Sequence, residues 1–252
     1  MQWKCIDTGF RTGRENMEFD LSLVKELENN SGKPTLRFYK WKPFCISTGY
    51  HQKQNEINLE LCKKDGIEIV TRPTGGRAIL HANELTYSVV MNSNGNSVNE
   101  VYCEISKAIV KGLNILGAKV EYSKNENNLS TFYKNDKSSF ACFATSSKYE
   151  IQFEGKKIVG SAQRRFTNKN EDEIILQHGS ILLDESHLQI SNFYSENIEN
   201  KKLILKKLSE ETSNLKQILG RNLQVEEIQN AVFEGFIKSK IFGFNSTCIS
   251  KI

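Results

Sequence analysis

The sequence lacks the features that would place it in a membrane, in the secretory pathway or on a nucleic acid. No apolar run approaches the ~18 residues of a membrane-spanning helix. Residues 1–7 contain no apolar stretch followed by a small-residue cleavage site, so we expect a cytoplasmic protein. The net charge is only +4 with both signs interspersed, which argues against a nucleic-acid partner. Proline is also scarce, with three residues where average usage would give roughly a dozen.

The cysteines form no C-x-x-C pair, which excludes a zinc ribbon and a thioredoxin-type redox motif. Histidines and carboxylates are not clustered at ligand spacing either, so we predict no metal site. A chain of 252 residues buries roughly 70% of its unfolded surface and needs no disulfides to be stable. We expect reduced thiols, of which one or two carry chemistry, at Cys5, Cys45, Cys62, Cys103, Cys142 and Cys248.

Hydrophobic periodicity predicts an α+β fold. Apolar residues recur every three or four positions in residues 15–28, 57–64, 98–113, 195–207 and 225–238, which favours helices there. Ser97 and Glu100 fit a capping box at the start of the third of these helices, and Gly117 fits its C-terminal cap. Strands are predicted over residues 3–7, 35–39, 44–47, 67–71, 78–80, 85–91, 149–153, 158–161 and 173–183.

The composition shifts near residue 184, beyond which the pattern predicts helices and no strand. We therefore predict a main domain over residues 1–186, with a mixed, mainly antiparallel sheet packed with helices. Residues 187–252 are predicted to be a small helical C-terminal extension.

The segment 72–81, Arg-Pro-Thr-Gly-Gly-Arg-Ala-Ile-Leu-His, lies between two predicted strands. Paired glycines let a backbone approach a ligand closely, and flanking arginines offer forked donors to an anion or a carbonyl. The spacing is not that of a phosphate-binding P-loop. The alternative is a hairpin turn with solvated arginines, and on the length of the segment alone that alternative is favoured.

A second segment places Cys142 between Phe140 and Phe143, shortly before a predicted hairpin that carries Lys156 and Lys157. A thiolate nucleophile needs a lowered pKa, which a nearby ammonium supplies. The alternative is a buried structural cysteine with lysines on a turn. A Cys–His pair with His81 is also conceivable, although a single histidine after a turn is more often a hydrogen-bonded structural group.

Several blocks, taken together and in order, resemble the biotin/lipoate protein ligase superfamily. Within it, the sequence looks most like the cysteine-dependent octanoyl-[acyl carrier protein]:protein N-octanoyltransferases of lipoate biosynthesis. The resemblance covers nearly the whole chain and implies the catalytic-domain fold of that superfamily for residues 1–186. The blocks are residues 3–20, 41–43, 49–52, 72–81, 84–88, the Cys142 segment, 149–150, 155–162, 176–180, 219–221 and 235–236.

The resemblance implies a two-step acyl transfer without ATP or any other cofactor. Cys142 matches the nucleophile that takes octanoyl from octanoyl-acyl carrier protein, and Lys157 matches the lysine that lowers its pKa. The lysine of a lipoyl domain, or of the glycine-cleavage H protein, then accepts the acyl group as an amide. The resemblance further implies substrate-binding roles for Arg72, Gly75, Gly76, Arg77, His81, Gly160, Ser161 and Ala162.

Three other functions fit the same fold. An ATP-dependent lipoate-protein ligase usually carries a third glycine where Arg77 stands and needs no cysteine at position 142. An amidotransferase that moves octanoyl or lipoyl groups between lipoyl-bearing proteins also uses a cysteine, in a different Gly-Gly context. A non-catalytic module that binds an acyl chain is allowed by fold alone. The longer turn at 168–172, Thr145-Ser146 and the tail 244–252 depart from the family pattern without touching Cys142 or Lys157.

Overall fold

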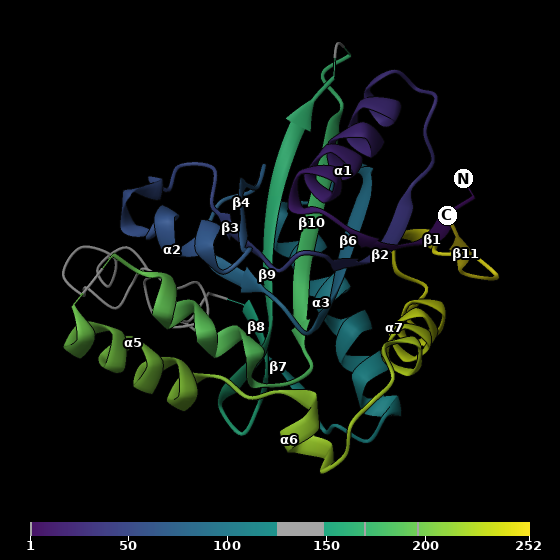
Figure 1. Cartoon of the computed structure of the whole chain (residues 1–252). Coiled ribbons are helices and arrows are strands. Elements are labelled where there is room, and N and C mark those ends of the chain that lie inside the picture. Colours follow the sequence, from purple (N-terminus) through teal and green to yellow (C-terminus); the bar gives the residue numbers. More distant parts are fainter. Residues whose placement is uncertain (1, 125–148, 169, 196) are drawn as a thin grey trace.

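The strands of the described residues form two sheets, and helices cover both faces of the larger one (Figure 1). The computed structural model describes residues 2–124, 149–168, 170–195 and 197–252. In these ranges the larger sheet has the order β11-β1-β2-β6-β10-β9-β8-β7, and the smaller has the order β4-β3-β5. The strands are β1 (Lys4–Arg11), β2 (Thr35–Trp41), β3 (Cys45–Thr48), β4 (Glu68–Thr71), β5 (Ile79–His81), β6 (Glu84–Asn92), β7 (Glu121–Lys124), β8 (Tyr149–Phe153), β9 (Lys156–Thr167), β10 (Glu173–Leu182) and β11 (Ser250–Lys251).

Neighbouring strands are antiparallel except for the pairs β11–β1, β1–β2 and β3–β4, which are parallel. The mixed, mainly antiparallel α+β fold predicted from the sequence is therefore confirmed. The helices are α1 (Gly13–Glu28), α2 (Leu59–Lys64), α3 (Val98–Ile115), α5 (Ile198–Glu211), α6 (Leu215–Leu219) and α7 (Val225–Ser239), with short 3-10 segments η1 (Gln54–Glu56), η4 (Glu185–Phe193) and η5 (Ile241–Gly243). None of the helices in the described ranges is both long and apolar enough to cross a bilayer.

The two faces of the larger sheet differ in chemistry. Alternate residues of β6, from Leu85 to Met91, join the main hydrophobic core under α3 and α7. On the opposite face, which α1 covers together with the smaller sheet, β6 presents Glu84, Thr86 and Ser88, all buried. These polar side chains therefore form a buried polar layer between β6 and the elements that cover it.

Helices α3 and α7 pack closely in the main core. Ser97 caps α3 through the predicted capping box with Glu100, which is confirmed. At the helix crossing, a Cβ on Gly235 would overlap the carbonyl oxygen of Ala108, so a glycine is required there. The resulting contact buries Val232 and Phe236 of α7 in the same hydrophobic cluster as residues of the strands.

The division of the chain into a main domain and a C-terminal extension at residue 186 stays a prediction.

The structure departs from the sequence prediction at β11 and β9, among other places. Residues Ser250–Lys251 form β11 beside β1, although no strand was expected beyond residue 184. A strand of two residues is too short to show the alternation of polar and apolar residues from which strands are predicted. Strand β9 also continues to Thr167, whereas the sequence predicts an end at Ser161. The polar run that follows Ser161 reads as a loop, but it is hydrogen-bonded along β10.

Candidate active site

A cavity lies between the larger sheet, α1 and the smaller sheet. It crosses four neighbouring strands in the order β2, β6, β10 and β9. Since strands are spaced by about 4.8 Å, the cavity wall spans roughly 14 Å across the sheet. The lining residues are Met17, Tyr39, Trp41, Ser47, Arg72, Ile79, His81, Thr86, Gly160, Ser161, Ala162, His178, Gly179 and Ser180.

His81 occupies the centre of one buried hydrogen-bond chain in this wall. Its Nδ1 lies 2.8 Å from Oε1 of Glu84, and its Nε2 lies 2.7 Å from Oγ of Ser47. The hydroxyls of Thr86 and Ser180 donate to the same Glu84 oxygen at 2.6 and 2.7 Å. Both ring nitrogens of His81 therefore have buried hydrogen-bond partners. The substrate-binding role predicted for His81 stays a prediction.

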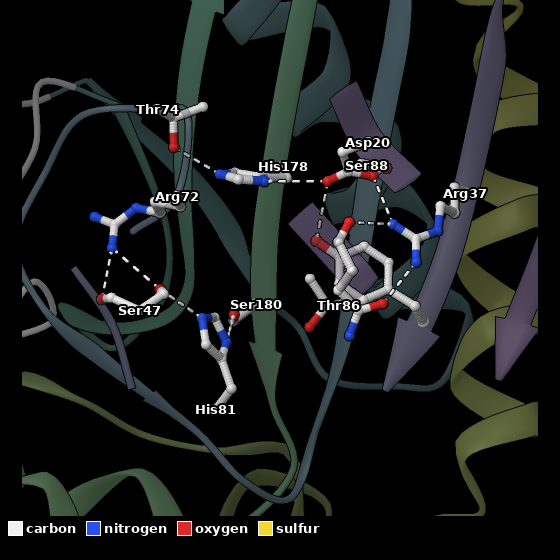
Figure 2. Close-up of polar contacts among 12 residues, drawn as sticks. Asp20, Arg37, Ser47, Arg72, Thr74, His81, Thr86, Ser88, His178 and Ser180 are labelled. Atoms are coloured by element: carbon white, nitrogen blue, oxygen red, sulfur yellow. Dashed lines mark hydrogen bonds and ion pairs between the residues drawn. The ribbon is translucent and has the colours of Figure 1, made fainter. Parts of the chain in front are cut away.

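The buried side chain of Arg72 stabilises the Gly-Gly turn by hydrogen bonds to its backbone. Its guanidinium donates to the carbonyl oxygens of Ser47, Gly75 and Arg77 at 2.8–2.9 Å. It also donates to Oγ of Ser47 at 3.2 Å, which joins the turn to the His81 chain (Figure 2). The side chain is buried while it also lines the cavity. Arg72 therefore fixes the loop backbone as well as forming part of the wall.

A second buried chain connects the turn to α1 through His178 (Figure 2). Nε2 of His178 lies 2.6 Å from Oγ1 of Thr74, and Nδ1 lies 3.4 Å from Oδ2 of Asp20. Arg37 and Ser88 donate to the other Asp20 oxygen at 2.7 and 2.8 Å. Residues 20 and 178 are remote in sequence and meet because α1 lies over β10.

Burial and charge set the protonation of this second chain. Burial raises the pKa of Asp20, but the Arg37 guanidinium and the bonds from His178 and Ser88 outweigh it and leave the pKa below its usual value. Burial lowers the pKa of His178, and Asp20 only partly opposes this effect. The histidine is therefore neutral at pH 7, donates from Nδ1 and accepts the Thr74 hydroxyl at Nε2.

Because these polar groups bond to one another, most of the surface that faces the cavity is apolar. The indole of Trp41 contributes to it, stacked on His81 with ring centroids 3.8 Å apart and its Nε1 donating to Thr86. Such a wall suits an alkyl chain, which needs no hydrogen bonds.

Gly179 brings β10 and β9 together at this wall. A Cβ at that position would lie 2.6 Å from Oγ of Ser161 and 2.7 Å from the carbonyl oxygen of Gly160. It would also lie 2.8 Å from a ring carbon of Tyr87 on β6. A larger residue would therefore displace the strand segment that carries the predicted substrate-binding residues.

The structure brings together five of the predicted substrate-binding residues, Arg72, His81, Gly160, Ser161 and Ala162, in one cavity wall. Gly75, Gly76 and Arg77 lie in the adjoining turn and are not among the residues that line the described cavity. Cys142 lies outside the described residues. Lys157 lies on β9, three residues before Gly160.

Lys157 is buried and forms an ion pair with Glu150 across the β8–β9 hairpin. Its Nζ lies 2.9 Å from Oε1 of Glu150, and each side chain is only 6% exposed. The Lys157 carbonyl oxygen accepts the amide of Ser213, which follows α5, at 3.0 Å. An ammonium is thus fixed on the same strand as one end of the cavity.

Sequence reasoning missed the buried polar residues that build this site. Asp20, Arg37, Glu84 and His178 were assigned no role, although Asp20, Glu84 and His178 lie inside the matched blocks. One signal was available: Glu84, Thr86 and Ser88 alternate with apolar residues in a strand that is otherwise suited to burial. Nothing local identifies Arg37, whose hydrogen-bond partners come from α1 and β1.

Comparisons with known proteins agree with one another. The model of the lipoyl protein ligase A/B catalytic domain matches residues 12–237. Octanoyltransferase LipM of Clostridioides difficile is 35% identical over 240 residues, covering 93% of this chain and 85% of that protein. Octanoyltransferase LipM of Geobacillus kaustophilus is 36% identical over 242 residues, covering 94% of this chain and 85% of that protein.

Among solved structures, a bi-partite lipoate protein ligase with its E2 lipoyl domain from Thermoplasma acidophilum has a TM-score of 0.73 at 23% identity, covering 100% of this chain and 88% of that chain. Lipoate-protein ligase A bound with ATP also has a TM-score of 0.73, at 22% identity, with coverage of 100% and 90%. These two likenesses show a shared fold.

Proposed function

The chain belongs to the lipoyl protein ligase A/B catalytic domain family and is a transferase, and from that premise we propose that it moves an octanoyl group onto a protein lysine in lipoate biosynthesis. The donor is octanoyl-acyl carrier protein. The acceptor is the lysine of a lipoyl domain or of the glycine-cleavage H protein. Relatives that are named octanoyltransferases and align over more than nine-tenths of the chain support the transfer of an octanoyl group.

The observation that carries the proposal is the apolar cavity itself. Its polar wall residues bond to one another, which leaves an apolar surface suited to an alkyl chain. At its β9 end the cavity reaches Gly160, and Lys157 lies three residues earlier on the same strand. We infer that the acyl carbonyl lies at this end of the cavity.

The reaction proceeds through a thioester on Cys142. Its thiolate, stabilised by the Lys157 ammonium, attacks the carbonyl of octanoyl-acyl carrier protein, and the carrier's thiol leaves. The ε-amine of the acceptor lysine then attacks the new thioester, forms the amide and releases the Cys142 thiol. Exchange between thioesters is nearly balanced and formation of an amide runs downhill, so no ATP is consumed.

Intact-mass spectrometry tests this function directly. Incubation with octanoyl-acyl carrier protein, without ATP, is expected to leave one hydroxylamine-labile octanoyl adduct on the wild type and none on Cys142→Ala. Cys248→Ser is the matched control, because Cys248 is an exposed thiol and its loss leaves the adduct intact. Absence of an adduct on the wild type, or equal labelling of Cys142→Ala, refutes the nucleophile. Transfer of free octanoate only when ATP is added identifies a ligase instead.

A further inference from the structure

Glu150 and Lys157 form a buried ion pair whose geometry depends on an irregularity in the β8–β9 hairpin. Gln152 pairs with Lys157, yet Ile151 pairs with Val159, so Ile158 is an extra residue on β9. Such a bulge bends a strand and re-aims its side chains. Glu150 and Gln152 share one face of β8, and the ammonium of Lys157 therefore meets the carboxylate of Glu150 diagonally, at 2.9 Å.

Fold stability does not account for this pair. Removing a carboxylate and an ammonium from water costs about as much as their attraction returns, so two apolar residues would stabilise the hairpin equally well. The surrounding residues Ile151, Ile158 and Val159 already form part of the main hydrophobic core. A charged pair kept beside such a core indicates a requirement for the charge itself.

The pair also fixes the position of a side chain that is flexible by nature. Lysine has four rotatable bonds, and its ammonium is a point charge that a single partner can hold in place. The backbone of Lys157 is held independently through its carbonyl oxygen and Ser213. Glu150 therefore orients the ammonium through the 2.9 Å ion pair.

We propose that Glu150 is a positioning residue, which acts through Lys157 by holding its side chain in one orientation on β9, the strand that forms one end of the acyl cavity. This inference rests on the proposed function, because it assigns a purpose to Lys157 in acyl transfer. Pre-organised charge accelerates a reaction only where it is held in place before the reaction begins. Loss of Glu150 would therefore slow acylation without removing any group that touches the substrate.

A double-mutant cycle tests the proposal. The single-turnover rate of acyl-adduct formation from octanoyl-acyl carrier protein is measured for wild type, Glu150→Gln, Lys157→Met and the double variant. We expect Glu150→Gln to lower this rate about tenfold in the wild-type background and by less than about twofold in the Lys157→Met background. Glu150→Asp, which retains the carboxylate, should recover part of the rate.

Glu121→Gln is the matched control, because Glu121 lies on the adjacent strand β7 and accepts only a 3.4 Å bond from Gln152. It is expected to leave the rate unchanged. Urea unfolding of the same variants gives a parallel cycle for stability. Coupling in stability without coupling in rate, or an equal Glu150→Gln effect in both backgrounds, overturns the positioning role. Absence of an adduct on the wild type overturns the proposed function instead, and the inference with it.

Discussion

The carboxyl group of Glu84 lies 2.8 Å from Nδ1 of His81, at the other end of a tight β5–β6 connection. Two hydroxyls, from Thr86 and Ser180, donate to the same oxygen, Oε1. The other oxygen, Oε2, is buried without a hydrogen-bond partner among the described residues. The described hydrogen bonds of the Glu84 side chain are therefore all made by one of its two oxygens.

Replacement of Glu84 by glutamine should destabilise the protein. In one orientation the glutamine NH2 would lie at the Oε2 position, buried without a partner. In the other orientation it would lie at the Oε1 position, facing His81 and the hydroxyls of Thr86 and Ser180. We expect a loss of about 2 kcal/mol in the free energy of unfolding, measured in urea. Glu104→Gln serves as the control, because the Glu104 side chain is only partly buried and pairs with Lys107 on the surface of α3. That control should lose less than about 0.5 kcal/mol, and an equal loss in both variants would contradict the prediction.

Stability should fall as the pH drops below about 6.5. Burial lowers the pKa of both His178 and His187 from their ordinary value of 6.5, so the unfolded chain takes up protons that the folded protein resists. The contribution is therefore complete above pH 6.5 and is lost as the pH falls toward the folded-state values. Urea unfolding between about pH 8 and pH 5.5 measures the slope. His178→Gln should flatten it, and an unchanged slope would exclude His178 as a source.

Gly235→Ala should weaken the packing of α7 on α3. The added methyl group would overlap the carbonyl oxygen of Ala108, and neither helix can shift without disturbing the core they share. We expect a loss of about 1–3 kcal/mol in the free energy of unfolding. Glu234→Ala, at the exposed preceding position of α7, should leave stability nearly unchanged. Equal midpoints for the two variants would show that the crossing is not tight.

Lys157→Ala should move the alkylation profile of Cys142 to higher pH. The ammonium favours the thiolate, and without it the thiol ionises only at more alkaline pH. The rate of carboxymethylation, followed by peptide mass spectrometry against pH, measures the change. Lys156→Ala is the matched control, since Lys156 is exposed and its Nζ contacts the Ser209 carbonyl oxygen at 3.4 Å. A profile that Lys157→Ala leaves in place would remove Lys157 from its proposed role.

Elements fixed by local chemistry could be predicted from the sequence. The Ser97–Glu100 capping box and the alternation in residues 85–91 depend on neighbours in the chain, and both are found in the structure. The same capping pattern, Thr12 with Glu15, starts α1 at Gly13, although the sequence prediction begins that helix at residue 15. The Thr12–Glu15 capping box thus indicates the start of α1 more accurately than the spacing of its apolar residues does.

The candidate site could be predicted only in part, because its walls come from segments that are distant in sequence. The resemblance identified Arg72, His81 and Gly160, which do line one cavity. It gave no account of why Asp20 and His178 belong together, since their contact depends on how α1 lies across β10. Nor does composition reveal that Glu150 pairs with Lys157, since that contact depends on a one-residue bulge.

The parallel pairing of β11 with β1 has a consequence for biosynthesis. Ile6 aligns with Ser250 and Asp7 with Lys251, so this edge of β1 gains its partner only after residues 250–251 have been made. A nascent chain would therefore expose the strand edge until that segment is synthesised, and unpaired edges are prone to aggregate.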